Sequence, residues 1–333
     1  MTYTLAIETS CDDTSIAIIK DKTTIISNLV SSQQKTHQQY GGVVPEVASR
    51  LHAETIHYLM DLSLKEAKIS LNDLSQVAVT IGPGLEGSLL VGISVAKSLS
   101  YALDIPLIPV NHIHGHIYAF SNYQPHLHYP ALALIVSGGH TDLILIEKEG
   151  SFKCCGKTRD DAVGEVFDKI ARSLSLGYPG GPIIEKMAKD GNPSAFKLPI
   201  AMKDSPFEFS FSGLKTATLD CIKSLDNPQD HLADICASFQ QTVIDTLILK
   251  TLAACEHFNI QDLIIGGGVA SNQTLLTAFK DRITDTSINL IHIQPNLCTD
   301  NAAMIGLAAT HLGNIDQIPT EDILVQSTFS YAH

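Results

Sequence analysis

The chain has 333 residues, of which 44% are hydrophobic and 17% charged, which excludes a disordered polypeptide and favours two domains over one. Its net charge of -13 argues against non-specific nucleic-acid binding, so a nucleic-acid substrate would need a local basic face or a basic partner. There is no run of about 18 apolar residues, so we expect no membrane span, and no basic segment before an apolar N-terminal core, so we expect no signal peptide. The cysteine spacings match no zinc or disulfide pattern, so we expect reduced thiols in a cytoplasmic protein.

Two segments share one pattern, an apolar run followed by a small polar turn and a second apolar run. They are residues 5–19 and 131–146. Each predicts a hairpin of buried strands. Because the segments lie about 130 residues apart, they indicate a duplicated domain rather than a short-period repeat. The turn at 136–140 (VSGGH) would offer backbone N–H groups to a phosphate, and an ordinary tight turn is the alternative.

Strands and helices alternate along the rest of the chain. We expect strands at 77–81, 106–110 and 263–265, and helices at 88–103, 159–171, 234–257, 271–282 and 301–311. Such alternation predicts an α/β architecture with largely buried sheets.

The segment 111–116 (NHIHGH) carries a candidate metal site. His112 and His116 are four residues apart and would share one face of a helix, which suits two imidazoles on one metal ion, whereas His114 lies on another face. A pair of ordinary surface or core histidines is the alternative. A metalloprotease needs Glu directly after the first histidine, and Ile113 stands there, so that interpretation loses its base. Asp300, just before the last predicted helix, could add a hard oxygen ligand or simply cap the helix.

Three further segments could bind a ligand or have ordinary structural roles. In the predicted helix at 159–171, Glu165 and Lys169 are spaced as an i,i+4 ion pair. A rigid, glycine-rich loop at 177–182 precedes Glu185. The segment 266–272 (GGGVASN) would let a base or ribose approach the backbone closely, with Asn272 pairing with ligand hydroxyls, capping the next helix, or both.

Taken in order, these motifs resemble the universal tRNA threonylcarbamoyladenosine synthesis transferases, formerly labelled sialoglycoprotein endopeptidases, and look like the bacterial branch. The resemblance covers nearly the whole chain. Besides His112 and His116, it rests on 8–14 (ETSCDDT), 44–52 (VPEVASRLH), 137–141 (SGGHT), 167–169 (FDK), 178–182 (YPGGP), 209–215 (FSFSGLK), 266–272 (GGGVASN) and 299–301 (TDN).

The resemblance implies an actin/Hsp70/sugar-kinase-like (ASKHA) α/β fold, with two duplicated mixed-sheet lobes and a central cleft. We expect a first lobe at 1–109 plus 305–333, and a second lobe at 110–304 that carries the metal and most ligand contacts. The implied reaction moves a threonylcarbamoyl group from threonylcarbamoyl-AMP to the N6 amine of adenosine 37 in tRNA and releases AMP. The implied partners are tRNA, a paralogous ASKHA-like subunit and a small P-loop ATPase.

The resemblance also assigns residues. One divalent ion, iron with zinc as the alternative, would be bound by His112, His116 and Asp300. Contacts to threonylcarbamoyl-AMP would come from Val136, Ser137, Gly138, Gly139, His140, Asp168, Gly181, Glu185 and Asn272. The general base stays open among Glu8, Asp12 and His140. The rival functions are a small-molecule kinase or ATPase of the same fold, a metalloprotease and a nucleotide-gated scaffold.

Overall fold

The first sheet has five strands in the order β3-β2-β1-β4-β5. Their bounds are β1 Tyr3–Glu8, β2 Asp13–Lys20, β3 Thr24–Ser32, β4 Gln76–Gly82 and β5 Leu107–Asn111. The first three strands form an antiparallel meander, and β4 and β5 continue the sheet parallel to β1. The apolar runs predicted at 5–19 and 77–81 are therefore central strands, and their side chains are buried as expected for strands with both faces covered.

The second sheet repeats this arrangement in the order β10-β9-β6-β7-β8. Its strands are β6 Ala131–Val136, β7 Thr141–Lys148, β8 Ser151–Lys157, β9 Asp262–Gly266 and β10 Asn289–His292. Again the first three strands in sequence are antiparallel, and the last two lie parallel to the first. Two sheets with the same order and the same strand directions confirm the predicted duplication.

The computed structural model describes residues 1–124, 126–312 and 320–328, which form two units. The first unit contains Met1–Leu127 and Ile293–His333, and the second contains His128–His292. The predicted boundaries differ, because 110–127 and 293–304 belong with the first sheet. The candidate metal ligands His112, His116 and Asp300 therefore lie in the first unit, and the prediction that the second lobe carries the metal was wrong. The reason is that α4 (His112–Tyr118) packs against α11 (Ala302–Leu312), which itself lies on strands β1 to β5. Of the predicted first lobe, 313–319 and 329–333 lie outside the described residues.

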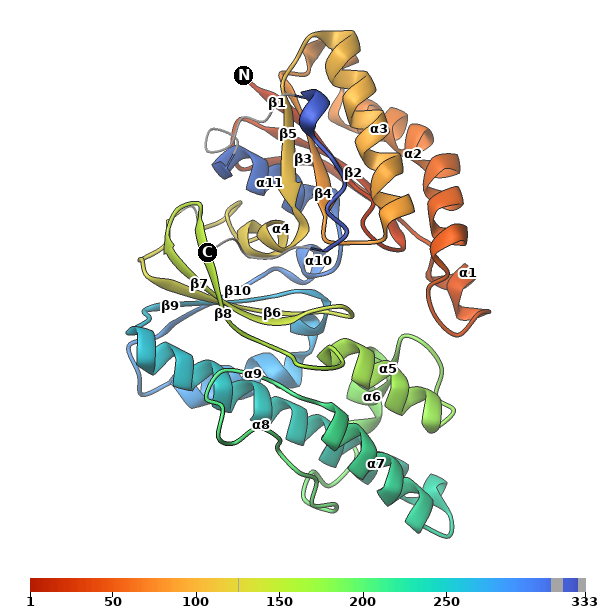
Figure 1. Cartoon of the computed structure of the whole chain (residues 1–333), viewed down its shortest axis with the longest axis vertical. Coiled ribbons are helices and arrows are strands. Elements are labelled where there is room, and N and C mark those ends of the chain that lie inside the picture. The colour runs from red at the N-terminus through yellow and green to blue at the C-terminus, as the bar shows by residue number, and fades with distance from the viewer. Residues whose placement is uncertain (125, 313–319, 329–333) are drawn as a thin grey trace. The chain divides into compact units, whose positions relative to one another are not determined.

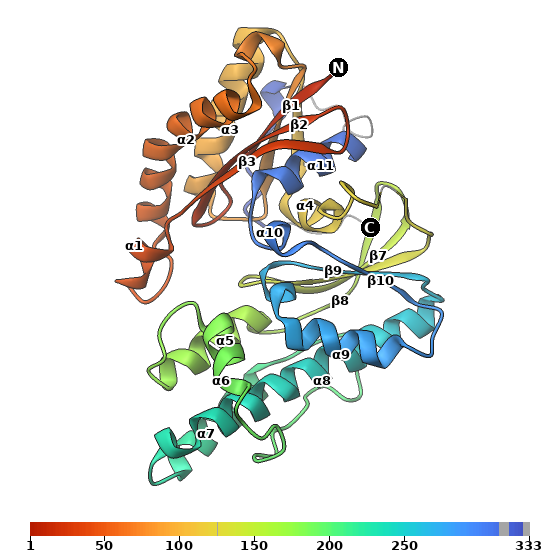
Figure 2. The same ribbon diagram turned by 180° about the vertical axis from the view of Figure 1, so that it is seen from behind.

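Helices cover both faces of the first sheet. Figures 1 and 2 show α2 and α3 on one side of it and α11 on the other. The helices of this unit are α1 Gln34–Gln38, α2 Pro45–Ala67, α3 Glu86–Leu103, α4, α10 Pro295–Cys298 and α11, with short 3-10 turns η1 Leu71–Asp73 and η4 Thr320–Asp322. The core between sheet and helices consists of aliphatic side chains from β1, β2, β4, α2 and α3.

In the second unit, α8 and α9 run along one face of the sheet (Figures 1 and 2). The helical elements are α5 Val163–Ser173, α6 Gly180–Ala188, α7 Ser212–Ser224, η2 Pro228–His231, α8 Leu232–Phe258, η3 Gly268–Ser271 and α9 Gln273–Ile283. The segment Pro228–Phe258 is long and apolar enough to cross a membrane, but 61% of its most apolar window is buried inside the protein. A buried core helix accounts for that composition.

Candidate metal centre and binding turn

The two candidate histidines are placed by a strand that runs directly into a helix. Asn111 ends β5, and its Oδ1 accepts hydrogen bonds from the N–H groups of Ile113 (2.8 Å) and His114 (3.3 Å), so it caps the N-terminus of α4. His112 is then the first residue of the helix and His116 the fifth, which puts both side chains on one face. Their ring centroids are 4.7 Å apart.

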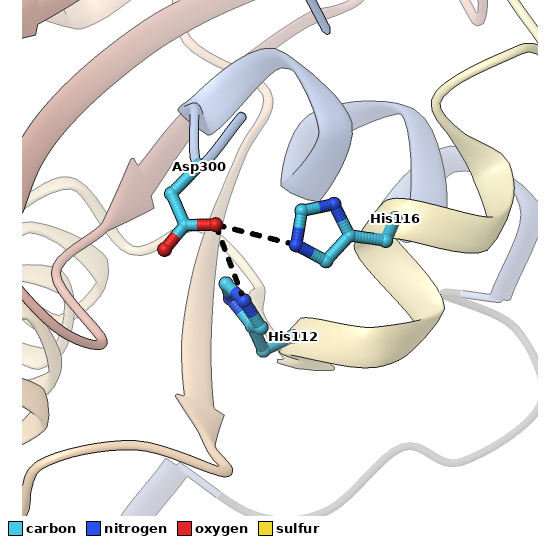
Figure 3. Close-up of side chains that lie close together, drawn as sticks. All are labelled: His112, His116 and Asp300. Atoms are coloured by element: carbon cyan, nitrogen blue, oxygen red, sulfur yellow. Dashed lines mark ion pairs between the residues drawn. The ribbon is translucent and has the colours of Figure 1, made fainter. Parts of the chain in front are cut away.

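Asp300 joins these histidines from a distant part of the sequence (Figure 3). Its Oδ1 lies 3.5 Å from Nε2 of His112 and 3.2 Å from Nε2 of His116. One ligand atom from each of the three residues lies within 4.8 Å of the others. Donors bound to one ion at about 2.1 Å lie roughly 3.0–3.5 Å apart, so a modest adjustment would bring all three onto a metal.

The burial of His116 supports the same interpretation. Its side chain is inaccessible to solvent, and among the described residues neither ring nitrogen has a hydrogen-bond partner of good geometry. Buried polar atoms are normally paired, so an imidazole left in this state needs an additional ligand. Two imidazoles and a carboxylate suit iron or zinc. The residues present therefore fit a divalent ion.

The charges around this centre shift its pKa values in opposite directions. Burial lowers the pKa of His112, but the carboxylates of Asp300 and Glu8 outweigh it and raise the value to about 9. Burial lowers the pKa of His116, and the opposing effect of Asp300 does not compensate. Burial would raise the pKa of Glu8, but the charge and hydrogen bond of His112 bring it below its usual value. The centre thus has one histidine that favours the neutral form.

The alternatives for this segment are weakened by the geometry. Ile113 is 2% exposed in the core, so the position that a metalloprotease would need for its base carries a buried alkyl group. Asp300 does not cap α11, because Oδ1 of Asn301 accepts the N–H of Met304 at 3.1 Å and supplies the cap. His114 is set apart from the ligands, and burial lowers its pKa to about 4.

The second candidate region is the turn at 136–140, which joins β6 to β7. Val136 pairs with Thr141 at the end of the hairpin, and its side chain is fully buried, so it can offer a ligand only its backbone. Oγ of Ser137 accepts the N–H groups of Gly139 (3.3 Å) and His140 (3.1 Å). Two of the N–H groups predicted to bind an anion are therefore bonded within the turn.

Glycines in neighbouring segments approach the backbone of this turn closely, and glycines within the turn leave space around it. A Cβ on Gly267, whose φ is +90°, would lie 2.4 Å from the carbonyl oxygen of Val136, and a Cβ on Gly164 would lie 2.6 Å from that of Ser137. At Gly138 and Gly139 an added Cβ would meet no described atom within 4 Å, and the same is true of Gly181 on α6. The backbone of Val136 and Ser137 is therefore closely packed by the segments that carry Gly267 and Gly164, whereas the backbone at Gly138 and Gly139 leaves room for a ligand.

Asp168, Glu185 and Asn272 tie the surrounding helices together. Oδ1 of Asp168 on α5 accepts the N–H of Gly180 at 2.7 Å, and Oε1 of Glu185 on α6 accepts the N–H of Gln273 at 2.8 Å. Oδ1 of Asn272 accepts the N–H of Leu275 at 2.9 Å and caps α9, as one sequence interpretation predicted. Helix α5 packs against both α6 and η3, so these predicted binding residues all lie in one region of the second unit.

Sequence reasoning missed the residues that hold the predicted ones in place. Nδ2 of Asn272 donates to Oε1 of Gln240 on α8 at 2.9 Å, which fixes the orientation of the amide. Oγ1 of Thr80, at the end of β4, donates to Oε2 of Glu8 at 2.5 Å. In the sequence, Gln240 and Thr80 are each a polar residue within a largely apolar element, and this pattern does not indicate which residue they contact.

Comparisons with known proteins agree with this description. The family model described as TsaD, tRNA N6-adenosine threonylcarbamoyltransferase, matches residues 24–307. A tRNA N6-adenosine threonylcarbamoyltransferase of Staphylococcus saprophyticus is 48% identical over 313 residues, which are 93% of this chain and 91% of the relative. A protein of the same name from Caldicellulosiruptor saccharolyticus is 50% identical over 306 residues, 91% of each chain.

Solved structures share the fold at low sequence identity. Full-length HypF, in a phosphate- and nucleotide-bound form, has a TM-score of 0.62 at 13% identity, over 95% of this chain and 47% of HypF. Component A of the Acidaminococcus fermentans (R)-2-hydroxyglutaryl-CoA dehydratase has a TM-score of 0.55 at 16% identity, over 94% of this chain and 97% of component A. At these identities the likeness establishes the two-sheet ASKHA architecture and nothing about the ligand.

Proposed function

Because the chain belongs to the tRNA N6-adenosine threonylcarbamoyltransferase family, we propose that it transfers a threonylcarbamoyl group from threonylcarbamoyl-AMP to the N6 amine of adenosine 37 in tRNA and releases AMP. The chain is an acyltransferase. The observation that carries the proposal beyond the family assignment is the convergence of His112, His116 and Asp300. Two imidazoles and one carboxylate suit iron or zinc, whereas the Mg²⁺ that a kinase of the same fold would use prefers oxygen ligands.

The metal site contributes the electrostatic part of the mechanism. His112, His116 and Asp300 would hold one divalent ion, iron with zinc as the alternative. When bound, the ion supplies a Lewis acid that stabilises negative charge developing during acyl transfer. The donor atoms come from α4 and from the turn just before α11, and these two helices pack against each other, so little reorganisation is needed on binding.

The donor is bound by the second unit. We assign the contacts to Val136, Ser137, Gly138, Gly139, His140, Asp168, Gly181, Glu185 and Asn272. The open space at three of these glycines supports a backbone that lies against the ligand. For the turn to bind a phosphate, the hydroxyl of Ser137 rotates away from the N–H groups of Gly139 and His140, which then donate to the anion.

The geometry narrows the choice of general base. Glu8 has no exposed surface and both of its carboxylate oxygens already accept hydrogen bonds, so it cannot take a proton from a substrate amine. Asp12 and His140 remain. Burial raises the pKa of Asp12, partly offset by a hydrogen bond from Cys11, and a raised pKa suits a proton acceptor at neutral pH. The two residues are distinguished by the pH-rate profiles of Asp12→Asn and His140→Gln.

The chain requires a partner protein to bind tRNA. Its net charge of -13 opposes association with phosphates, so a partner supplies basic surface. We assign that role to a paralogous ASKHA-like subunit, and turnover to a small P-loop ATPase. We also propose that the protein acts in the cytoplasm, where tRNA and reduced thiols occur together.

The proposal is tested by incubating tRNA and threonylcarbamoyl-AMP with the purified chain and these partners, followed by mass analysis of the digested nucleosides. We expect threonylcarbamoyladenosine in the complete reaction and none when the chain is omitted. A parallel incubation of the chain with ATP and a panel of sugars tests the kinase alternative, which predicts phosphorylated sugars there and no tRNA modification in the first reaction.

A further inference from the structure

Glu8 is a fully buried carboxylate at the end of the central strand β1. Oε1 accepts the N–H of Ser10 at 2.6 Å, and Oε2 accepts the hydroxyl of Thr80 at 2.5 Å. Oε2 also lies 3.1 Å from Nδ1 of His112. A buried carboxylate is costly unless its lone pairs are used, and here donors from three separate segments use them. Glu8 is thus fixed in position before any ligand arrives.

The two nitrogens of His112 face different groups. Nδ1 faces Oε2 of Glu8 at 3.1 Å and Oγ of Ser10 at 3.2 Å, while Nε2 faces Oδ1 of Asp300 at 3.5 Å. Both carboxylates can only accept, but the contact of Nδ1 with Glu8 (3.1 Å) is shorter than that of Nε2 with Asp300 (3.5 Å). The neutral ring therefore carries its proton on Nδ1 and the lone pair on Nε2. That lone pair points to the side on which His116 and Asp300 converge.

From this geometry we infer that Glu8 is a positioning residue, which holds His112 as the Nδ1–H tautomer and aims Nε2 at the metal. The inference rests on the proposed metal site and adds to it the group that orients one ligand. A carboxylate behind a metal-binding imidazole fixes the ring and increases its basicity, and removing such a partner typically weakens metal binding by about 10- to 100-fold.

The two histidines differ in this support. Among the described residues, Nδ1 of His116 has no hydrogen-bond partner, whereas Nδ1 of His112 faces a carboxylate and a hydroxyl. The carboxylate is the stronger acceptor because it is charged. The hydroxyl of Ser10 is neutral and is therefore the weaker acceptor for the Nδ1 proton. Removing this hydroxyl should weaken metal binding much less than removing the charge of Glu8.

The test measures Co²⁺ affinity of the full chain by its visible absorption in competition with a chelator. Glu8→Gln keeps the shape of the side chain and should raise the dissociation constant at least tenfold, with the far-UV circular dichroism unchanged. Ser10→Ala and Thr80→Val remove the neighbouring hydroxyls and should each change it by less than about threefold. Nitrogen-15 spectra of the metal-free protein above about pH 9, where the ring of His112 is neutral, should show Nδ1 of His112 protonated in the wild type and the tautomer mixture shifted in Glu8→Gln.

The outcomes separate this inference from the metal site itself. If His116→Ala abolishes Co²⁺ binding but Glu8→Gln binds as tightly as the wild type, Glu8 does not position His112. The same conclusion follows if Ser10→Ala causes the tenfold loss instead. If His116→Ala binds Co²⁺ as well as the wild type, the metal site is misassigned, and the role of Glu8 is refuted with it.

Discussion

Oδ1 of Asp168 accepts a hydrogen bond from the backbone N–H of Gly180, with 2.7 Å between oxygen and nitrogen. Gly180 is the first residue of α6, so a side chain on α5 satisfies one of the N–H groups that a helix leaves unpaired at its start. The bond also fixes Gly181, which follows immediately and faces open space. Asp168 therefore has a structural role whether or not it also contacts the donor.

Replacing Asp168 with Ala should loosen the start of α6. Loss of a capping acceptor costs about 1 kcal/mol, which corresponds to roughly fivefold faster hydrogen exchange at the amide of Gly180 if exchange occurs by local opening. Amide exchange followed by mass spectrometry or NMR measures this change. Glu165→Ala on the same helix is the control, since Glu165 pairs with Lys169 and should leave the amide of Gly180 as protected as before.

Replacing Asn111 with Ala should weaken both the fold and the metal site. The substitution leaves two N–H groups of α4 without their acceptor and costs about 1 kcal/mol of unfolding free energy. Because His112 is the next residue, metal affinity should fall as well. Chemical denaturation and a metal titration measure the two effects. Asn111→Ser restores an accepting oxygen and should recover most of both; equal losses in the Ser and Ala variants would exclude capping as the cause.

Asp142 should make the protein less stable as the pH rises. Burial raises the pKa of this carboxyl to about 6, although Lys157 acts in the opposite direction. The folded state therefore retains a proton that the unfolded state, with a pKa near 3.8, has released. Between about pH 4 and pH 6 the folded state binds more protons, so the free energy of unfolding falls as the pH increases.

Asp142→Asn removes this effect, so the variant should match the wild type near pH 4 and exceed its stability by about 1 kcal/mol or more at pH 7.5. Thermal unfolding of both proteins across this range provides the difference curve. A constant difference at every pH would show that the carboxyl of Asp142 titrates normally in the folded protein.

Asn272→Asp should separate donor binding from helix capping. The new carboxylate still accepts the N–H of Leu275, and the amide of Gln240 can turn to donate to it, so the melting temperature should change little. The variant has lost the side-chain N–H that would meet a ligand hydroxyl, and its charge repels a phosphate. We expect at least a tenfold weaker affinity for threonylcarbamoyl-AMP, measured by calorimetry. An unchanged affinity would remove Asn272 from the donor site.

The sequence predicted the central parts of the fold better than its edges. The hairpins β1–β2 and β6–β7 and the strand β4 were recognised, because their continuous apolar runs leave few other conformations that bury them. The edge strands β3 and β8 were not recognised, since Ser and Lys interrupt their apolar pattern and most of their residues are only partly buried. The helices α2 and α7 were also missed. Polar His52 and Ser63 interrupt the buried face of α2, and only Leu214 and Thr218 of α7 are buried, so neither helix has a clear apolar stripe.

The candidate site was predictable to different degrees. The spacing of His112 and His116 suggested a shared ligand directly, because four residues on a helix bring two side chains together. Nothing in the local sequence indicates that Asp300 joins them, and that assignment came from the family resemblance. The role of Glu8 depends on the parallel pairing of β1 with β4, which brings Thr80 beside it, and such pairing cannot be derived from either strand alone.

The central claim is that His112, His116 and Asp300 bind one metal ion that the transfer reaction requires. The most direct measurement compares metal content and tRNA modification for the wild type, Asp300→Ala and His116→Ala after identical loading with Fe²⁺ under anaerobic conditions. His57→Ala, which removes an exposed histidine of α2, is the control. We predict one ion per chain and full activity in the wild type and control, and loss of both in the two ligand variants. A double variant, His116→Ala with Asp300→Ala, that holds one ion and modifies tRNA at the wild-type rate would contradict the claim.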